Sequence, residues 1–303
     1  MFLPVMYVSA LSVIRPFDPW RSPLCTCPRK YTLNPYTGCS HMCLYCYATS
    51  YIGKRESTPK RDLIVRVVRD LKQILRFETE PLINMSTSSD PYPPEETIHK
   101  LTRRVLEILC KHPVRLLITT KSSLVVRDLD LLRKARCAVA ITVTTLDESL
   151  AKKLEPNAPS PRERLRAIER LSREDVPVAV RIDPVIPFVN DDPAELRRLV
   201  QEVVSSGAVH VVTSTYKARP DNFRRLLDAF PELERKLRRL YYEEGEKVHG
   251  YRYLRPDLRK KLLAPIIECC RTVGVSYAVC REGIPEYRRA PSCDGSHLVR
   301  SRA

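Results

Sequence analysis

Residues 34–48 read NPYTGCSHMCLYCYA and contain three cysteines, Cys39, Cys43 and Cys46, in the spacing C-x3-C-x2-C. Three thiolates this close in the chain can bind one iron–sulfur cluster when the loop wraps around it, and cysteine thiolates are the usual ligands of such clusters. Gly38 and Pro35 favour that turn, because glycine tolerates strained backbone angles and proline fixes one of them. The stretch therefore predicts a loop that binds metal.

The loop supplies three ligands, whereas a cubane cluster has four irons. A metal site with an open coordination position is built to bind a further molecule, and a structural site is closed by protein ligands. Two closed alternatives remain at this point, a zinc site or an electron-transfer cluster, with His41 or a cysteine outside the loop as the fourth ligand. An open site at the end of a β/α unit would instead favour an enzyme.

Apolar runs of strand length alternate with amphipathic helical stretches from about residue 30 to residue 213. The runs are continuous Val, Ile, Leu and Ala segments, which predicts strands with both faces covered. The expected strands are 30–34, 82–86, 114–119, 138–143, 177–183 and 208–213, and the expected helices are 62–77, 95–111, 124–134, 162–173 and 192–206. Six β/α units in series predict an α/β fold with a parallel sheet and right-handed crossovers.

We expect this sheet to form a partial (β/α)6 TIM-type barrel, because six units are too few for a closed eight-stranded barrel. A doubly wound sheet remains an alternative, but no G-x-G-x-x-G follows the first strand and no Walker loop is present to support it. The expected divisions are an N-terminal segment (1–29), a core (30–215) and a basic, helical C-terminal extension packed on that core (216–303). The apolar start, 1–17, is expected to belong to the fold, because no basic residue precedes Arg15 as in a signal peptide.

The composition is that of a globular protein: of 303 residues, 43% are hydrophobic and 29% are charged. No apolar run approaches the roughly 18 residues of a membrane span, so we expect a cytoplasmic protein with no membrane partner. Asn and Gln together number 7 and Gly 8, against 25 Pro, a balance that favours a thermophilic source.

The net charge of +16 comes mostly from the two ends of the chain. Residues 1–62 hold 8 basic and 3 acidic side chains and residues 216–303 hold 20 and 12, whereas the middle is nearly balanced. A positive field of this size favours anionic partners, nucleic acid first, although it serves general solubility equally well. The basic residues proposed to contact phosphates are Arg219, Arg224, Arg225, Arg235, Lys236, Arg238 and Arg239, and a solvated helix face is the alternative.

The cysteine loop resembles the signature of the radical S-adenosylmethionine (SAM) superfamily, and the whole of residues 34–48 resembles its spore photoproduct lyase-like branch. Further segments agree in order, with the last of them agreeing more weakly: SSDPYPPEE, LTRRVLE, ITTKSSLVVRDLDLL, TTLDESLAKKLEPNAPSPRERLRAI, DPVIPFVND and CREGIPEYRRAPSCDGSHL. The resemblance implies a 4Fe-4S cluster on Cys39, Cys43 and Cys46 whose unique iron binds SAM. It also implies that one electron splits the sulfonium bond, and that the resulting 5′-deoxyadenosyl radical abstracts hydrogen from a substrate.

The resemblance also implies which residues hold SAM. Tyr45 would pack by the adenine, and Lys121, at the end of a strand, would hold the carboxylate. Ser88, Ser89 and Asp90 would face the amino group, although Asp90 could equally cap a turn. On the fourth and fifth strands, Thr142 or Thr144 would reach the ribose and Arg181 would face the same cavity, with Asp183 beside it.

One departure concerns the hydrogen donor. Spore photoproduct lyase has a cysteine just after its second strand that returns a hydrogen atom to the product radical, whereas residues 85–90 of this chain read MSTSSD. A hydroxyl O–H bond is much too strong to replace a thiol, which makes thymine-dimer reversal by that route doubtful. Cys137 or Tyr92 would be the remaining candidates, although core packing is the more usual role of a cysteine such as Cys137.

Four further cysteines raise the possibility of a second metal site. Cys25 and Cys27 lie near one end of the chain, and Cys280 and Cys293 near the other, so the two pairs could meet and bind a second cluster or zinc. His297 is an alternative ligand, and Cys269 and Cys270 are expected in the core.

Three functions follow. The first is a radical SAM enzyme that repairs or modifies DNA or RNA and takes its electron from a ferredoxin or flavodoxin. The second is the same chemistry on a peptide or a small metabolite. The third is a non-catalytic iron–sulfur or zinc protein that binds nucleic acid.

Overall fold

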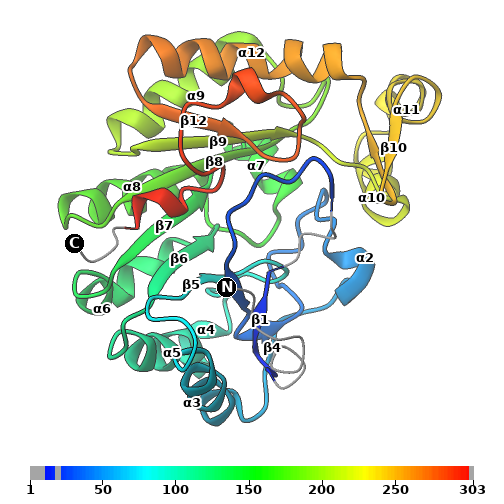
Figure 1. Cartoon of the computed structure of the whole chain (residues 1–303). Coiled ribbons are helices and arrows are strands. Elements are labelled where there is room, and N and C mark those ends of the chain that lie inside the picture. The colour runs from blue at the N-terminus through cyan, green and yellow to red at the C-terminus, as the bar shows by residue number, and fades with distance from the viewer. Residues whose placement is uncertain (1–10, 18–21, 300–303) are drawn as a thin grey trace.

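The computed structural model describes residues 11–17 and 22–299 (Figure 1). Its centre is an eight-stranded sheet in the order β1-β2-β5-β6-β7-β8-β9-β12, in which only β1 runs antiparallel to its neighbour. The strands are β1 (Ile14–Pro16), β2 (Tyr31–Leu33), β5 (Leu82–Met85), β6 (Arg115–Thr120), β7 (Cys137–Thr142), β8 (Val178–Val185), β9 (His210–Thr215) and β12 (Ser276–Val279). The α/β fold with a mostly parallel sheet is consistent with a partial TIM-type barrel. The expectation for residues 1–10 lies outside the described residues.

Helices cover the outer face of the sheet. The main ones are α3 (Leu63–Ile74), α5 (Leu101–Leu109), α8 (Pro161–Arg173), α9 (Pro193–Ser205) and α12 (Pro256–Thr272), with the short α4 (Glu96–His99), η1 (Ser123–Asp128), α6 (Leu129–Leu132) and α7 (Glu148–Leu154) in the connections. The sequence itself marks several starts: Ser160 and Glu163 form a capping box ahead of α8, and Asp192 caps α9. Pro161 and Pro193 occupy the first position of their helices, where no amide hydrogen is needed.

Large and small side chains alternate along the strands. The apolar runs do not reveal this alternation, because both kinds of side chain are apolar. In β7, Val139 and Ile141 point outward into the core beneath the helices, whereas Ala138 and Ala140 point to the inner face. Successive side chains of a strand lie on opposite faces, so residues two apart share one. The inner positions carry small or polar side chains at most strands, and this leaves space inside the curve of the sheet.

The C-terminal region adds a strand to the sheet. Residues Ser276–Val279 pair in parallel with β9 as β12, so the sheet has seven parallel strands and not the six that we expected. At four residues, this strand is short, and the long helix α12 precedes it. The other elements of the region are α10 (Pro220–Ala229), η2 (Pro231–Leu233), α11 (Glu234–Arg238), the π-helical turn η3 (Arg239–Glu243), the hairpin β10 (Glu246–Val248) and β11 (Tyr251–Tyr253), and the turns η4 (Pro285–Tyr287) and η5 (Ser296–Leu298).

The end of the described chain enters the inner face of the sheet. Leu298 and Val299 pack on Leu117 and the small residues of β7 and β8, where Ala138, Ala140 and Ala179 leave room for them. Gly295 adopts a positive φ of 86°, and a Cβ there would lie 2.7 Å from Ala179 Cβ. The inner face is thus filled at one end of the sheet. The remaining space lies toward the carboxyl ends of the parallel strands.

Among the described residues, no helix has both the length and the apolar character that crossing a membrane requires.

Candidate active site

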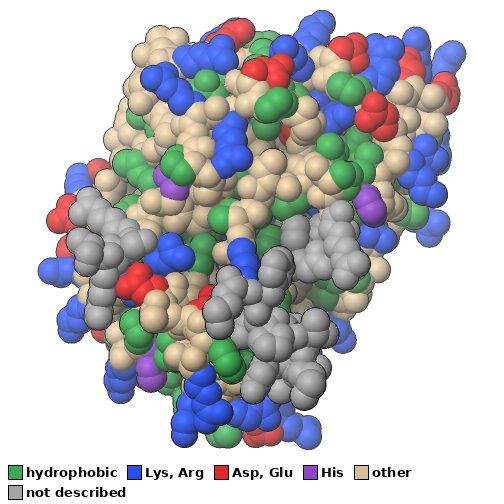
Figure 2. Space-filling view, viewed as in Figure 1, with side chains coloured by type: hydrophobic (Ala, Val, Ile, Leu, Met, Phe, Trp, Pro, Cys, Tyr) green, Lys and Arg blue, Asp and Glu red, His purple; other side chains and the backbone are tan. Residues whose placement is uncertain are grey.

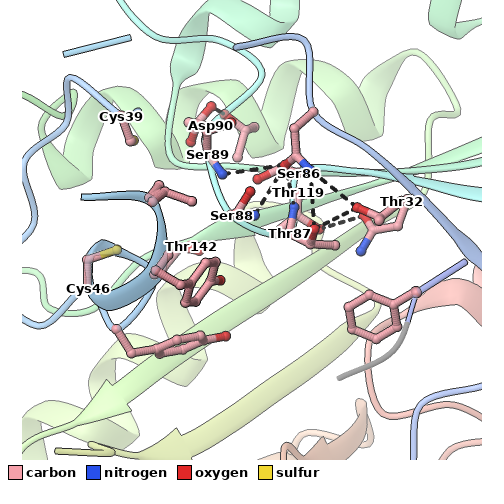
Figure 3. Close-up of a pocket in the computed structure, with 18 of the residues that line it drawn as sticks. Thr32, Cys39, Cys46, Ser86, Thr87, Ser88, Ser89, Asp90, Thr119 and Thr142 are labelled. Carbon is pink, nitrogen blue, oxygen red and sulfur yellow. Dashed lines mark hydrogen bonds between the residues drawn. The ribbon is translucent and has the colours of Figure 1, made fainter. Parts of the chain in front are cut away.

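A cavity of about 1000 Å³ lies inside the curve of the sheet. The inner positions of successive strands and the residues just after them form much of its wall: Thr32, Asn34, Asn84, Ser86, Thr119, Lys121, Thr142, Arg181, Asp183, Ser214 and Cys280. Figure 3 shows part of this wall, with Cys39 and Cys46 on one side, Thr32 on the other, and the polar turn of residues 86–90 between them. A cavity at this end of a β/α sheet is where such folds place their ligands.

The cysteine loop forms one side of the cavity, and Cys39, Cys43 and Cys46 all line it. The loop follows β3 (Tyr36–Thr37) and leads into the helix α2 (Thr49–Ile52). After α2 the chain returns as β4 (Thr58–Pro59), which pairs with β3 and so closes the base of the loop. Gly38 has a positive φ of 82°, and a Cβ there would lie 2.2 Å from the Glu56 carbonyl oxygen. Glycine is therefore required at the start of the loop, because the backbone of Glu56 leaves no room for a side chain.

His41 lines the same cavity as the three cysteines. Its side chain is buried, with Nδ1 3.3 Å from the Asn157 carbonyl oxygen and Nε2 3.3 Å from Asp90 Oδ2. Both ring nitrogens therefore face groups that hold the loop in place. The donor set of three thiols facing a cavity fits a cluster with one open iron.

Burial raises the pKa of the Cys39 thiol to about 12 and that of Cys43 well above its usual range. Iron binding would therefore have to displace the protons of these thiols, as metal binding to cysteine does generally. The Lys121 ammonium is the main group acting in the opposite direction on Cys43.

Arg225, in α10, points toward the cysteine loop and holds it in place. The sequence pattern predicts instead an exposed side chain that contacts the phosphates of a nucleic acid. Its guanidinium donates hydrogen bonds to the carbonyl oxygens of Leu44 (3.2 Å) and Cys46 (2.9 Å), and to the Thr49 hydroxyl (2.9 Å). It also pairs with Asp221 at 3.3 Å. The prediction for Arg225 was wrong because charge alone does not show which side of an amphipathic helix faces the core.

Replacing Arg225 with glutamine should weaken retention of the cluster by about 10- to 100-fold, the usual cost of removing an outer group that orients metal ligands. The carbonyl oxygens of Leu44 and Cys46 would lose their donors, and the loop would open more readily. The measurement is the rate of iron loss to a chelator from anaerobically reconstituted protein. Arg224→Gln is the matched control, because Arg224 is exposed on the same helix and should leave the rate unchanged.

Some of the other basic residues proposed to contact phosphates are paired within the chain and others are exposed, and none of them lines the cavity. Arg238 pairs with Glu234 at 2.7 Å, Arg239 with Glu244 at 2.6 Å, and Arg219 lies 4.9 Å above the Tyr251 ring. Arg224, Arg235 and Lys236 are exposed. On the face shown in Figure 2, Lys and Arg side chains are spread over the surface with Asp and Glu among them, and they form no single basic patch.

The turn after β5 is organised by Asn34. Its Oδ1 accepts hydrogen bonds from the backbone amides of Thr87 (3.0 Å), Ser88 (3.2 Å) and Ser89 (3.4 Å). The Ser89 hydroxyl donates to the Tyr36 carbonyl oxygen at 2.8 Å. Ser88 and Ser89 both line the cavity, as the resemblance implied for SAM-binding residues, but Ser89 is already engaged by the backbone. Ser88, which is half-buried, has the freer hydroxyl.

Asp90 joins the cysteine loop to the strand ends. Its carboxylate accepts hydrogen bonds from the Thr120 hydroxyl (2.6 Å), the Lys121 amide (2.8 Å) and the Tyr92 amide (2.9 Å), and it faces His41. Burial alone would raise its pKa, but His41 and these hydrogen bonds lower the pKa from 3.8 to about 2. Asp90 lines the cavity, and its geometry is that of a residue that positions its neighbours.

The Asp90 carboxylate should make folding stability depend on pH below about 4. A carboxyl group with a lower pKa in the folded chain contributes stability above its unfolded pKa and loses it as pH falls through the folded value, here toward 2. The loss should be on the order of 2 kcal/mol. The measurement is urea unfolding at pH 7 and pH 2.5, made on metal-free protein because iron–sulfur clusters dissolve in acid. The free energy of unfolding should fall more between the two pH values in the wild type than in Asp90→Asn. Equal pH dependence in both proteins would contradict the assignment.

Tyr45 belongs to a buried ionic network that sequence reasoning missed. Its hydroxyl donates to Glu155, which also pairs with Arg164 at 2.5 Å, and the Lys121 ammonium lies 5.4 Å from the Tyr45 ring centre. Arg164 further donates to the Thr142 carbonyl oxygen at 3.0 Å. Neighbouring cations lower the pKa of Glu155 although burial opposes them. The signal in the sequence was the charged segment LEPNAPSPRER, which includes both residues.

The fourth and fifth strands contribute differently from the expectation. Thr142, Arg181 and Asp183 line the cavity, and Asp183 accepts hydrogen bonds from Arg181 and from the Ser214 hydroxyl. Thr144 does not line it: this residue is 2% exposed, and its carbonyl oxygen accepts a hydrogen bond from Asn190 at 2.9 Å. Of the two threonines, only Thr142 is placed to meet a ligand there.

Neither candidate hydrogen donor reaches the cavity. Tyr92 is fully buried and lies beside Arg127 and Asp128 beneath the helices. Cys137 is 5% exposed, and its thiol faces the Leu132 carbonyl oxygen at 3.3 Å. Both residues occupy outward positions of the fold, so neither can contact a substrate inside the sheet.

The four cysteines proposed for a second metal site do meet near the cavity. Cys27 Sγ lies 3.4 Å from Cys293 Sγ, and Cys25, Cys27 and Cys280 line the cavity. Hydrogen bonds from Cys25 and Cys293, together with Lys30, lower the pKa of the Cys27 thiol. His297 instead faces Ser292 and His210, and Cys269 and Cys270 are buried in the core.

Within residues 11–17 and 22–299, no three or more His, Cys, Asp or Glu side chains are arranged to hold a single metal ion. The second metal site is therefore not formed by the side chains as they stand. The three thiols of the cysteine loop do not converge on a single ion either. A four-iron cluster does not require this, because each thiolate would bind a different iron of the cluster.

Three thiols thus line a cavity inside the curve of a mostly parallel α/β sheet. The sequence model of the Radical SAM superfamily matches residues 33–200, more than half of the chain. The chain therefore belongs to the radical SAM superfamily and is a radical SAM enzyme, which confirms the resemblance seen in the cysteine loop. Membership implies a 4Fe-4S cluster, SAM cleavage and radical chemistry.

Three relatives illustrate the relationship. An uncharacterized protein of Mycobacterium tuberculosis is 29% identical over 263 residues, covering 82% of this chain and 76% of that protein. A protein named radical SAM Nalpha-GlyT isomerase, from Pseudomonas phage M6, is 24% identical over 270 residues, covering 84% of this chain and 53% of that protein. A spore photoproduct lyase with bound AdoMet and dinucleoside spore photoproduct has a TM-score of 0.68 at 16% identity, covering 86% of this chain and 79% of that one, and thus shares the fold.

Proposed function

We propose that this radical SAM enzyme acts on nucleic acid, by repair or by modification of a base. The proposal assigns Cys39, Cys43 and Cys46 as the cluster ligands, which is supported by three thiols on one wall of a cavity of about 1000 Å³. When bound, the cluster supplies the electron that cleaves SAM. The residues of the chain orient SAM and substrate and exclude water from them.

The proposed SAM site lies between the cysteine loop and the strand ends. Tyr45, Lys121 and Cys43 line the cavity together with the polar turn that contains Ser88, Ser89 and Asp90. Lys121 is the cation that we assign to the carboxylate of SAM, because it lies 5.4 Å from the Tyr45 ring centre, whereas Arg164 is paired with Glu155. Thr142 and Arg181 would complete the wall toward the ribose and the substrate.

Nucleic acid is favoured as substrate by the cations of the cavity wall and by the fold shared with a spore photoproduct lyase that holds a dinucleoside. The resemblance in fold does not extend to the hydrogen donor, since residues 85–90 contain no cysteine. The reaction proposed is therefore a radical transformation of a nucleotide other than thymine-dimer reversal by that route. A peptide or small metabolite remains the second candidate substrate.

The test is to compare nucleic acid and metabolites, by mass spectrometry, from cells with the intact protein and with Cys43→Ala. A modified or repaired nucleotide that changes only with the intact cysteine loop would support the proposal. A peptide or metabolite that changes while every nucleotide stays constant would overturn the substrate assignment. Purified, reduced protein should form 5′-deoxyadenosine in either case.

A second metal site at Cys25, Cys27, Cys280 and Cys293 is part of the proposal, supported by the approach of Cys27 and Cys293 beside the cavity. Anaerobic protein should then lose a distinct portion of its iron or zinc on changing Cys27 and Cys293 to serine, while the cluster on the loop stays intact. Equal metal content in the two proteins would show that these thiols hold no metal.

Three further expectations are proposals as well: a thermophilic source, a cytoplasmic location, and a ferredoxin or flavodoxin as electron donor. A high unfolding temperature and reduction by either type of donor would support the first and the third.

A further inference from the structure

Every acidic residue on the cavity wall already has a partner. Asp294 pairs with Lys30, Asp183 with Arg181, and Asp90 faces His41 and accepts three hydrogen bonds. The remaining charge of the wall is positive. It is concentrated near β1 and β4, where Arg15, Lys60, Arg61 and Arg66 line the cavity.

Three of these cations lie close together, and none of them is paired with a carboxylate of the described residues. Burial lowers the pKa of the Lys60 ammonium to about 8, and repulsion by Arg15 and Arg66 adds to the effect. In the part of the chain that the structure describes, no Asp or Glu forms an ion pair with Arg15, Lys60 or Arg66. Like charges held together in this way cost free energy unless an anion joins them.

The backbone holds the two guanidinium groups in place. The Ser12 carbonyl oxygen accepts hydrogen bonds from Arg15 Nε (3.1 Å) and Arg66 Nη2 (3.4 Å), and the Ser12 hydroxyl accepts one from Arg66 Nε (3.2 Å). Asp70 is the nearest organising acid, and it does not line the cavity. Its carboxylate is occupied by the amides of Ser12, Val13 and Ile14 and by Arg69.

We propose that Arg15, Lys60 and Arg66 form a phosphate-binding wall that holds the backbone of a nucleic acid substrate while its base enters the cavity. Guanidinium and ammonium groups are the usual partners of phosphates, and a guanidinium has hydrogens left to donate after binding Ser12. The assignment rests on the proposed function for the class of substrate. It moves the phosphate contacts from the exposed helices α10 and α11 to the cavity itself.

The experiment measures binding of a short fluorescein-labelled single-stranded DNA, and of RNA with the same sequence, to the anaerobic holoenzyme with SAM. The triple variant Arg15→Gln, Lys60→Gln, Arg66→Gln should bind the better of the two probes roughly 10- to 100-fold more weakly at about 100 mM salt. The slope of log affinity against log salt should become shallower by about 2, because each phosphate contact on a single strand contributes about 0.7.

The matched control removes the same charge elsewhere. Arg162, Arg166 and Arg170 are exposed on α8 and do not line the cavity, so their glutamine variants should keep both affinity and slope. Lys60→Gln alone, which leaves the contacts of Ser12 intact, should reproduce about a third of the change in slope and guards against a folding defect in the triple variant. The inference is overturned if the α8 variant weakens binding as much as the cavity variant, or if the cavity variant keeps its salt slope.

The two proposals fail in different ways. Wild-type protein that cleaves SAM but binds neither probe would contradict the nucleic acid substrate itself. Wild-type protein that binds a probe with an affinity unaffected by the cavity substitutions would contradict only the phosphate wall. Formation of 5′-deoxyadenosine without substrate reports cluster and SAM, and it should be similar in the wild-type and α8 proteins.

Discussion

Replacing Cys43 with alanine is expected to abolish reductive cleavage of SAM. Cys43 is one of three loop thiols that line the cavity, and two thiolates are too few to hold a four-iron cluster with a single open corner. Removing even an outer group of a metal site commonly costs 10- to 100-fold, so loss of a ligand should cost about 100-fold or more. The measurement is 5′-deoxyadenosine formed per chain after anaerobic reconstitution and reduction, together with iron content and the visible absorption of the cluster.

Cys137→Ala is the matched control. This cysteine is also buried, but its thiol faces the Leu132 carbonyl oxygen in the core beneath the helices. Its replacement should leave iron content and SAM cleavage near the wild-type level, at the expense of a modest loss of stability. Undiminished 5′-deoxyadenosine formation by the Cys43 variant would contradict the assignment of the cluster ligands.

Replacing Arg164 with leucine is expected to lower the free energy of unfolding by about 3 to 5 kcal/mol. Arg164 and Glu155 are each about 1% exposed, and their side chains pair at 2.5 Å. Losing the guanidinium would leave the Glu155 carboxylate buried next to Tyr45, with Lys121 as the remaining cation nearby. Urea unfolding at neutral pH measures the loss.

Two comparisons separate a broken ion pair from simple loss of packing. The double variant Glu155→Gln, Arg164→Leu should recover much of the stability, because a buried pair replaced on both sides leaves no unpaired charge. Arg166→Leu, an exposed change two residues away, should stay within about 0.5 kcal/mol of the wild type. A double variant no more stable than Arg164→Leu alone would show that the ion pair is not what stabilises this region.

The cysteine loop was predictable because its chemistry is local. Cys39, Cys43 and Cys46 lie within one short loop, so their spacing alone brings three thiols to one wall. The strands of the core were also predictable, since apolar runs must be buried wherever they lie. β12 was missed as a member of the sheet because four residues after a long helix carry little pattern of their own, and only pairing with β9 makes them a strand.

Residues that act through distant partners were not predictable in the same way. Arg225 was expected at the surface, yet it is 181 positions from Leu44, whose carbonyl oxygen it binds. Glu155 and Tyr45 are 110 positions apart. Their roles depend on which helix face turns inward, and charge and periodicity do not settle that.

By itself, the amino-acid sequence determined the class of chemistry and the α/β architecture, because both depend on short-range spacing and on the burial of apolar runs. Only the tertiary structure decided which inner-face positions meet in one cavity, which arginines hold the loop, and which cations have no carboxylate partner within residues 11–17 and 22–299. The physical reason is that the interaction of two charged side chains depends on the distance between them in the folded chain, and not on their separation in the sequence. The folded sheet brings the strand ends together and thereby decides which charges are paired.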